Sequence, residues 1–465
     1  MSELKNQNTI IVDIGKTHVK IHLLDRDFIS ICSKQMKNII IKGEYPSVNV
    51  EGIWDWLVVN LRELNKQYTV KALTFTTHGA TAALIDRNSE SIDGLVLPIL
   101  DYEYDCAKDI NAEYAALRQD FTKTFSPNLP LGLNLGRQLL WLKKNYCEQF
   151  SKATDILLYP QYWAWRFTGK RQSEITSLGC HTDLWSIADN NYSSLVTNLQ
   201  IKDLFPSIKP AYFDCGEVLP DVATKLGLNT QCRFYSGIHD SNASYLRYKL
   251  AIEREEFTVI STGTWTVLMN SQAKLGKLDE NKDMLANIDA MGSPIACARF
   301  MGGREFEEIC EKAGSWLGEQ FNESDVQSII DLEVFALPNF SEGSGPFGKC
   351  EGHFIGPVVR ISGIALATLY CALMIDYQLE MLAAKGNIFI EGAFLKNPIL
   401  TSILSQLRQE QEVFLSQDST GTVYGAAQLT DWKQKKCEII TEKASVTQLV
   451  NLQAYRSAWR NLISL

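Results

Sequence analysis

The sequence lacks the cysteine spacing that would build a disulfide framework or a zinc site. Its 11 cysteines are scattered from Cys32 to Cys437, and no two of them form a CxxC pair. An odd and dispersed set of this kind is typical of a protein whose thiols stay reduced. We therefore expect mostly buried, free cysteines.

The sequence also has no excess of basic charge. Lys and Arg number 45 against 54 Asp and Glu, for a formal net charge of -9. This balance gives a nucleic-acid backbone no general electrostatic reason to bind, so we expect no nucleic-acid partner. A small anionic ligand held by local backbone donors is compatible with the same balance.

No segment reaches the roughly 20 apolar residues that a membrane-spanning helix needs. The longest uncharged run, Ile361–Ile375, contains Ser362 and Thr368 and stops at Asp376. We expect it to form a buried helix between domains. Residues Met1–Asn8 carry neither a basic start nor an apolar stretch, so the sequence predicts a cytoplasmic protein that does not act at a membrane.

What the sequence does contain is the composition of a globular protein. Its 465 residues are 45% hydrophobic and 21% charged, and this length suits two or three domains. Alternating apolar and polar residues over Thr9–Asp25 predict a β-hairpin that turns at Gly15. A helix beginning near Ile53 and a strand over Val70–Phe75 follow, which indicates a mixed α/β layer. Further helices are expected over Tyr104–Phe121 and Arg137–Phe150.

A similarity between two segments of the sequence, here called the echo, suggests a duplicated fold. The segment Thr258–Val267 can be laid over Ile10–Val19 with Gly263 and Gly15 in register, and each segment reads as strand, glycine turn, strand. Two similar α/β domains meeting near residue 250 would place the two glycine turns across a ligand cleft. Short β-turn-β segments also resemble one another by chance, and the echo alone does not decide between these explanations.

Two motifs match nucleotide-binding patterns only superficially. Gly15-Lys16-Thr17 lacks the first glycine of a P-loop, because residue 10 is Ile10. The stretch Gly343–Gly348 fits GxGxxG, but Pro346 indicates an irregular loop where the dinucleotide fingerprint needs the start of a helix. We therefore reject both a P-loop and an NAD site.

Two short segments carry acids that could act in catalysis. Asp13, at the end of a predicted strand, could hold Mg²⁺ through water beside a phosphate, although an ordinary hairpin turn explains the same residues. Asp240, between a predicted strand and helix, could accept a proton from a hydroxyl. An N-cap role for Asp240 is the competing explanation, and the adjacent His239 is either a rival base or structural.

A third segment, near the C-terminus, is a buried strand that leads through Gly392 to a helix start. Gly392 would let a flat ring or a phosphate approach the backbone, and Asn397 could cap the helix or bind a ligand. Small residues over Tyr424–Ala427 would allow close helix packing.

Taken in order, these segments resemble the FGGY family of carbohydrate kinases over nearly the whole chain. Asp13–Thr17 is similar to the first phosphate motif, and His78–Asp86 to the sugar-site strand of xylulokinases. Gly237–Ala243 and Ser261–Trp265 resemble the catalytic segment and the second phosphate motif of L-fuculokinases and rhamnulokinases. The adenosine motif and the helix that closes it are matched by Gly392–Pro398 and Tyr424–Ala427.

The resemblance implies two duplicated actin-like, ribonuclease H-like α/β domains, 1–248 and 249–465, with a central ligand cleft. It implies ATP and Mg²⁺ as cofactors and transfer of the γ-phosphate to a terminal hydroxyl of a ketose, such as L-fuculose, L-rhamnulose or xylulose. The resemblance leaves the oligomeric state undecided, with a homodimer as one possibility. Asp240 would be the catalytic base, and Asp13 would hold the metal. The implied sugar-site residues are Thr77, His78, Gly79, Asp101, Glu103 and Asp240. The implied ATP-site residues are Asp13, Gly15, Lys16, Thr17, Thr262, Gly263, Thr264, Gly392, Ala393, Lys396 and Asn397.

Three departures from the family pattern fall near the implied sites. Lys16 is unusual in the first phosphate motif, Gln161 stands where many members have Asp, and Leu100–Tyr104 replaces the usual sugar-site sequence. The alternative function is therefore a catalytically silent nucleotide- or sugar-binding sensor of the same fold. Retention of Asp240 argues against it, because loss of the base is the expected mark of an inactive kinase.

Overall fold

The computed structural model describes residues 7–106, 108–252, 255–272, 274–341, 343–416, 421–432 and 439–464. The chain divides into two compact units. Unit 1 comprises residues 1–251, 286–294 and 420–438, and unit 2 comprises 252–285, 295–419 and 439–465. The family-domain boundary expected between residues 248 and 249 stays a prediction.

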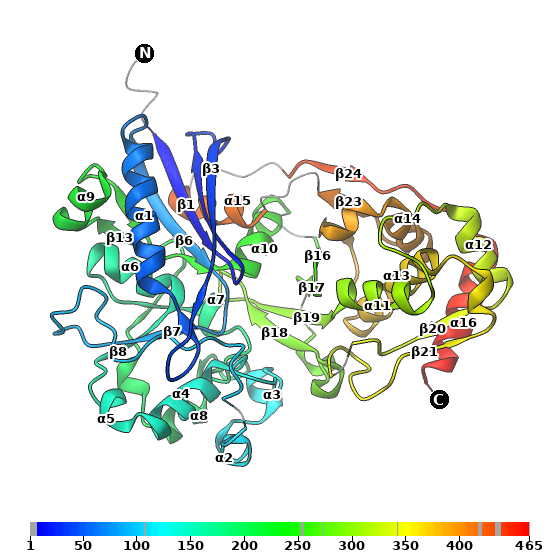
Figure 1. Ribbon diagram of the computed structural model, residues 1–465, viewed down its shortest axis with the longest axis horizontal. Helices are drawn as coiled ribbons and strands as arrows, with labels where there is room; N and C mark the ends of the chain where they lie inside the picture. The colour runs from blue at the N-terminus through cyan, green and yellow to red at the C-terminus, as the bar shows by residue number, and fades with distance from the viewer. Residues whose placement is uncertain are drawn as a thin grey trace. The chain divides into compact units, whose positions relative to one another are not determined.

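Unit 1 is built on a mixed β-sheet (Figure 1). The strand order is β13-β14-β6-β1-β2-β3, and β15 also pairs with β6. The strands are β1 (Asn8–Ile14), β2 (His18–Leu24), β3 (Ser30–Lys37), β6 (Val70–Thr77), β13 (Asp214–Glu217), β14 (Arg233–Tyr235) and β15 (Ile238–His239). β1 is antiparallel to β2 and parallel to β6. The predicted N-terminal hairpin is therefore confirmed.

Helix α1 (Val50–Asn65) covers this sheet with an apolar face. Ile53, Leu57 and Leu61 recur at helical spacing, and all three are fully buried in one core with strand residues such as Val12. The Asn49 side chain caps the helix by accepting a hydrogen bond from the Gly52 amide at 3.0 Å. The sequence pattern thus predicted both the helix and its buried side.

The remaining elements of unit 1 are short. The helices are α2 (Asn111–Leu117), α3 (Phe121–Thr124), α4 (Leu135–Asn145), α5 (Cys147–Phe150), α6 (Tyr159–Thr168), α7 (Ile175–Leu178), α8 (Ser194–Asn198), α9 (Pro220–Leu226), α10 (Asp240–Ala251) and α15 (Gly421–Gln428). The small strands are β4 (Ile40–Ile41), β5 (Ser47–Val48), β7 (Ala82–Ile85), β8 (Asp155–Leu158), β9 (Ser173–Glu174), β10 (Trp185–Ser186), β11 (Asn191–Tyr192) and β12 (Ile208–Lys209).

Two helix predictions in this unit were too long. The helix expected over Tyr104–Phe121 is only α2, because Arg118 takes an extended conformation and its Nε donates to the buried Asp183 at 3.0 Å. The helix expected over Arg137–Phe150 is split into α4 and α5 at Tyr146, whose φ and ψ of -130° and 46° are not helical. Tertiary contacts and local backbone conformation override helical periodicity at both places.

Unit 2 repeats the sheet pattern of unit 1. Its strands follow the order β19-β17-β16-β22-β23-β24. They are β16 (Phe257–Thr262), β17 (Thr266–Asn270), β19 (Pro294–Phe300), β22 (Asn387–Gly392), β23 (Val413–Ser416) and β24 (Thr441–Lys443). Counted from β19 to β24, neighbouring strands pair antiparallel twice, then parallel twice, then antiparallel once. Counted from β3 to β13, the sheet of unit 1 has the same series of pairings. The duplicated fold is therefore confirmed.

The helices of unit 2 pack around one long buried helix. The elements are α11 (Gly302–Lys312), α12 (Glu323–Asp331), α13 (Gly363–Met381), α14 (Pro398–Leu407) and α16 (Leu452–Leu462), with small strands β20 (Phe335–Leu337) and β21 (His353–Ile355). Strand β18 (Leu285–Ile288) falls mostly in the 286–294 segment of unit 1. Among the described residues, α13 is the one helix long and apolar enough to cross a membrane, and 83% of its apolar window is buried in the protein. The predicted buried helix is confirmed, but it belongs to the core of unit 2 and does not lie between domains.

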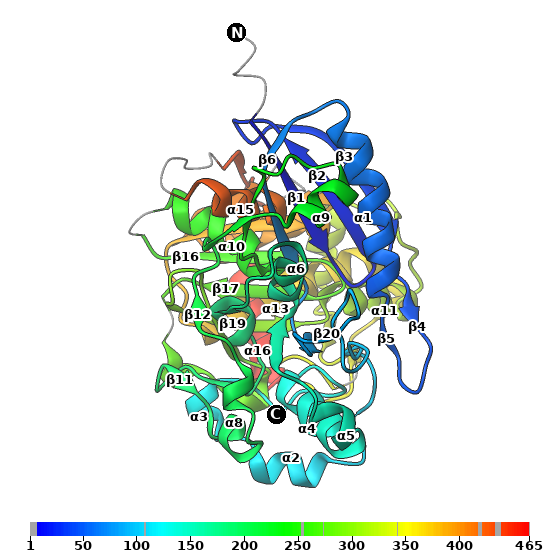
Figure 2. The same cartoon turned by 90° about the vertical axis from the view of Figure 1, so that its left-hand side faces the viewer.

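Helix α15 returns to unit 1 from late in the sequence. It packs against α10, and Figure 2 shows the two helices side by side. A β-carbon at Gly425 would fall well inside van der Waals contact of the Ala243 carbonyl, so the helices touch through backbone. The prediction of close packing over Tyr424–Ala427 is confirmed.

The described cysteines are free thiols, and most of them are buried. Cys437 lies outside the described residues.

Candidate active site

The first glycine turn joins β1 to β2 and places Asp13 near the end of β1. The Gly15 amide donates to the His18 carbonyl at 3.0 Å, and the Asn38 side chain donates to the Gly15 carbonyl at 2.9 Å. Burial raises the pKa of Asp13 to about 6, and the charge of Asp240 adds to this rise. The two candidate acids therefore lie close enough to interact. Thr17 is exposed at the tip of the turn.

Asp240 opens helix α10 directly after strand β15. Its Oδ1 accepts hydrogen bonds from the Ser241 amide at 2.6 Å and from the Ser241 hydroxyl at 3.3 Å. Burial raises the pKa of the Asp240 carboxyl, and the neighbouring His78 opposes the rise. The side chain is still 31% exposed, so the carboxylate is both perturbed and reachable.

The predicted sugar strand ends beside this carboxylate. β6 ends at Thr77, which pairs in register with His239 of β15. The imidazole of His78 packs against the rings of Tyr102 and Tyr159, with ring centroids 5.2 and 5.3 Å away. Burial lowers the pKa of His78, while the charge of Asp240 raises it. The structure thus brings together the sugar-strand residues, Asp13 and Asp240, all within unit 1.

Lys16 is held by acids of the segment that departs from the family pattern. Its Nζ forms ion pairs with Asp101 and, at 3.1 Å, with Glu103. The same Nζ lies 4.8 Å from the centre of the Tyr102 ring. In the structure, the Lys16 amine is therefore engaged by the 101–103 segment. The ATP-site role implied for Lys16 stays a prediction.

Gln161 supports the strand that leads to Asp240. Its side chain is fully buried, and its Nε2 donates to the Ser236 carbonyl at 3.0 Å and to the Gly237 carbonyl at 3.3 Å. Ser236 directly precedes the segment Gly237–Ala243 and Gly237 begins it, so Gln161 has a structural role in unit 1.

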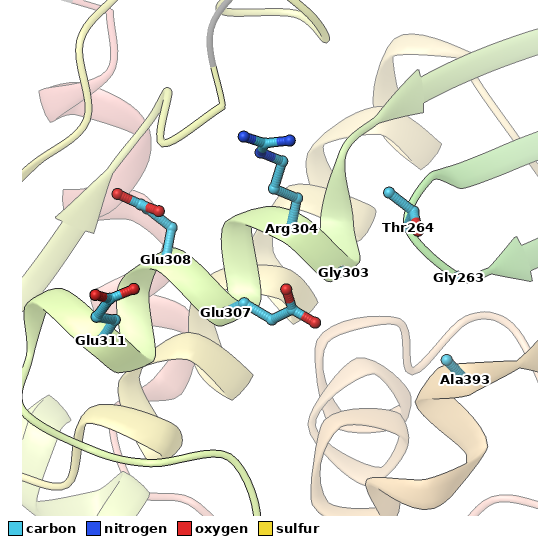
Figure 3. A pocket seen from close by; sticks show the side chains of 8 residues that line it. All are labelled: Gly263, Thr264, Gly303, Arg304, Glu307, Glu308, Glu311 and Ala393. Atoms are coloured by element: carbon cyan, nitrogen blue, oxygen red, sulfur yellow. The ribbon is translucent and has the colours of Figure 1, made fainter.

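The second glycine turn, in unit 2, lines a cavity of about 440 Å³ (Figure 3). Gly263 and Thr264 line one side, and Ala393 contributes from the start of the predicted adenosine motif. The rest of the lining comes from α11 through Gly303, Arg304, Glu307, Glu308 and Glu311.

Helix α11 was not recognised from the sequence as part of this site. A β-carbon at Gly303 would clash with the Gly263 carbonyl, so the helix start lies directly against the glycine turn. Backbone amides at a helix N-terminus suit an anion. The adjacent pair Gly302-Gly303 before Arg304 was the signal that could have indicated this close approach.

A second, largely apolar cavity of about 530 Å³ shares three of these residues. Its lining includes the predicted ATP-site residues Ala393, Lys396 and Asn397. The apolar lining comes from Phe306, Leu317, Phe321, Ile364, Phe394, Pro398 and Ile399. The first cavity is therefore lined mainly by polar groups, and the second mainly by apolar side chains.

Three of the predicted ATP-site residues are already used by the fold of unit 2. The Thr262 hydroxyl donates to the Glu391 carbonyl at 2.6 Å and accepts from the Phe394 amide at 2.9 Å. The Asn397 side chain caps α14 by accepting a hydrogen bond from the Leu400 amide at 3.1 Å, and its Nδ2 donates to the Thr368 hydroxyl at 2.9 Å. Gly392 has a φ of 92°, and a β-carbon there would clash with the Thr262 carbonyl. Their conformations are explained without a ligand.

Family models match both halves of the chain. The N-terminal domain of the FGGY family of carbohydrate kinases matches residues 8–246, and the C-terminal domain of the same family matches residues 254–438. The chain belongs to the FGGY family of carbohydrate kinases.

Individual FGGY relatives are similar to this chain at modest identity. L-fuculokinase of Escherichia coli K12 is 22% identical over 289 residues, which is 58% of this chain and 58% of that protein. Rhamnulokinase of Oceanobacillus iheyensis is 26% identical over 138 residues, 28% of this chain and 27% of that protein. The chain therefore matches 58% of the length of the L-fuculokinase and 27% of the length of the rhamnulokinase.

Solved structures extend the FGGY likeness over nearly the whole chain. A carbohydrate kinase from Novosphingobium aromaticivorans is 30% identical, with a TM-score of 0.88 and coverage of 98% of both chains. Xylulose kinase from Lactobacillus acidophilus, 17% identical with a TM-score of 0.81, covers 98% of this chain and 97% of its own, and shows the same fold.

Proposed function

We propose that the protein is an ATP-dependent kinase that transfers the γ-phosphate of MgATP to a terminal hydroxyl of a ketose. The observation that carries this proposal is the placement of Asp240. Its carboxylate is fixed at the start of α10, remains partly exposed, and interacts electrostatically with Asp13 and His78. A positioned carboxylate beside polar sugar-strand residues suits proton abstraction from a hydroxyl.

The two cavities of unit 2 support binding of the nucleotide. Phosphates would meet the amides of the second glycine turn and of the α11 N-terminus, together with the Arg304 side chain. The adenine ring would enter the apolar cavity lined by Phe306, Phe321 and Phe394.

Asp13 is the proposed protein contact for Mg²⁺. Within the described residues, no group of three or more His, Cys, Asp or Glu side chains is arranged to hold a metal ion. Mg²⁺ commonly keeps several waters and takes one or two carboxylates plus substrate phosphates, so a single half-buried acid fits it. The raised pKa of Asp13, caused by burial and by Asp240, is the mark of a carboxylate that a cation would stabilise. Bound Mg²⁺ would neutralise charge on the phosphates.

The proposed reaction needs little covalent help from the protein. Asp240 accepts the proton of the sugar hydroxyl as that oxygen attacks the γ-phosphorus, and ADP leaves. The chain's own work is to orient the hydroxyl and to hold the proton acceptor in place. We expect this reaction in the cytoplasm, where ATP is available.

A 6-deoxyketohexose or a ketopentose is the proposed acceptor. The named relatives that support it are an L-fuculokinase and a rhamnulokinase, together with the xylulose kinase fold. The segment around Asp101 differs from the common sugar-site sequence, so the relatives do not by themselves select one sugar.

A substrate screen tests this function directly. The purified full chain is given MgATP and, in separate wells, L-fuculose, L-rhamnulose, D-xylulose, D-fructose or glycerol, and ADP release is coupled to NADH oxidation. We expect one ketose to be phosphorylated far faster than the others. Asp240→Asn should lower this turnover by about 10² to 10⁴ while nucleotide binding persists. Binding of nucleotide and sugar without any ADP release would instead support the silent sensor.

A further inference from the structure

A buried imidazole contacts the proposed base directly. His239 is 5% exposed and ends strand β15, and its backbone amide donates to the Thr176 hydroxyl at 3.2 Å. Its Nε2 lies 3.2 Å from Oδ1 of Asp240, and its Nδ1 lies 3.1 Å from Nδ2 of Asn242. The ring is thus held between an amide and the carboxylate.

The neighbours of the ring determine where its proton sits. Nδ2 of Asn242 also lies 3.4 Å from the Thr176 carbonyl. A carbonyl oxygen only accepts, so the amide nitrogen of Asn242 faces both groups and donates to Nδ1 of His239. The neutral ring then carries its proton on Nε2, which lies 3.2 Å from Oδ1 of Asp240. The Cys180 sulfur, 3.7 Å from the same Nε2, is left as a weak acceptor.

The hydrogen-bond donors around Asp240 give its two carboxylate oxygens different basicities. Oδ1 accepts from the Ser241 amide and the Ser241 hydroxyl, and Nε2 of His239 lies 3.2 Å from the same oxygen. Oxygens that already accept several hydrogen bonds are less basic than unoccupied ones. Within the described residues, no protein donor contacts Oδ2 in this way, and Oδ2 is therefore the oxygen suited to take the proton of the sugar hydroxyl.

We infer that His239 is a positioning residue that donates from Nε2 to Oδ1 of Asp240 and thereby presents Oδ2 to the substrate. This inference rests on the proposed function, in which Asp240 is the base. It assigns no proton transfer to His239 itself.

Burial supports a fixed neutral ring. It lowers the pKa of His239 to about 4, so the imidazole stays uncharged at neutral pH and cannot serve there as an acid. The close approach of Gly79 to Nε2 leaves the ring little room to turn.

The first test reads the tautomer without a substrate. The full chain is labelled with ¹⁵N-histidine, and the His239 signals are assigned by their loss in His239→Gln. We expect the protonated nitrogen of His239 to be Nε2 from pH 8 down to about pH 5. A neutral ring that carries its proton on Nδ1 would overturn the inference.

The second test separates positioning from folding. With the ketose phosphorylated in the screen, His239→Leu should lower kcat by about 10- to 100-fold with little change in the KM of either substrate. His239→Gln keeps a neutral N–H donor near the same place and should recover most of the activity. His22→Leu is the matched control, because His22 is another buried histidine of unit 1, with its pKa also lowered to about 4. It should keep the parental kcat.

The outcomes distinguish the inference from the proposed function. If Asp240→Asn is inactive and His239→Leu has the parental kcat, Asp240 remains the base and the positioning role is wrong. If His239→Gln is as impaired as His239→Leu, the ring fills space and its N–H is not needed. If Asp240→Asn itself keeps full activity, the proposed base and the inference both fail.

Discussion

Gly79 lies so close to His239 that a β-carbon at residue 79 would be 2.9 Å from the imidazole Nε2. The glycine of the predicted sugar strand therefore leaves room for the side chain that contacts the proposed base. This contact links the residues after β6 to the segment Gly237–Ala243 within unit 1.

Gly79→Ala should push the His239 ring away from Asp240. We expect kcat to fall and the free energy of unfolding to drop by about 1 to 3 kcal/mol, as is usual for overpacking a buried site. Turnover assays and urea denaturation measure the two effects. Gly43→Ala is the control, since its nearest neighbour would be 3.6 Å away and both quantities should be unchanged. Parental turnover in Gly79→Ala would show that the ring tolerates displacement.

Asp13→Asn should raise the magnesium concentration needed for half-maximal activity by about 10- to 100-fold, the usual effect of losing an outer-shell partner of a metal. The reason is that asparagine has no negative charge, so the substitution removes the Asp13 carboxylate near the end of β1. A magnesium titration at saturating ATP measures the change. Asp55→Asn, on the exposed side of α1, should titrate like the parent. An unchanged titration for Asp13→Asn would remove Asp13 from the site.

Lys16→Met should affect the sugar more than ATP. The side chain of Asp101 is 9% exposed and would lose its cation, which destabilises the 101–103 segment beside Asp240. We expect the KM of the ketose to rise about tenfold, equivalent to 1.4 kcal/mol, with the KM of ATP little changed. Lys34→Met, which breaks the more exposed pair with Glu63, is the control. A selective rise in the KM of ATP would instead support a phosphate-binding role for Lys16.

Gly392→Ala should destabilise unit 2 and not select between ligands. The φ of 92° and the clash of a β-carbon with the Thr262 carbonyl both oppose a side chain. We expect the free energy of unfolding to fall by about 2 kcal/mol or more. Gly276→Ala, where a β-carbon would meet nothing within 4 Å, should be neutral. Selective loss of ATP affinity at the parental melting temperature would show that the nucleotide, and not the backbone, requires this glycine.

His22 should make stability depend on pH. Burial, with a contribution from Lys20, lowers its pKa to about 4, below the 6.5 of an exposed histidine. The unfolded chain therefore binds the proton first, and stability present above pH 6.5 is lost as the pH falls towards 4. The stability difference between the parent and His22→Gln should shrink by roughly 2 to 3 kcal/mol between pH 7 and pH 4. Urea denaturation at both pH values measures it, and a difference independent of pH would contradict the assignment.

The sequence by itself determined the elements whose pattern is local. Alternation and a glycine turn were enough for both hairpins, helical spacing was enough for α1 and its buried face, and the order of the motifs was enough for the family. These features depend on backbone geometry and side-chain periodicity, which neighbouring residues carry.

Only the tertiary structure decided which distant residues meet. Lys16 reaches Asp101 across 85 positions of the chain, and no spacing rule connects a glycine turn to that segment. The same holds for Gly79 beside His239 and for α11 against the second glycine turn. Such partners are set by packing, because strands far apart in sequence become neighbours only when the sheet forms and the core closes around them.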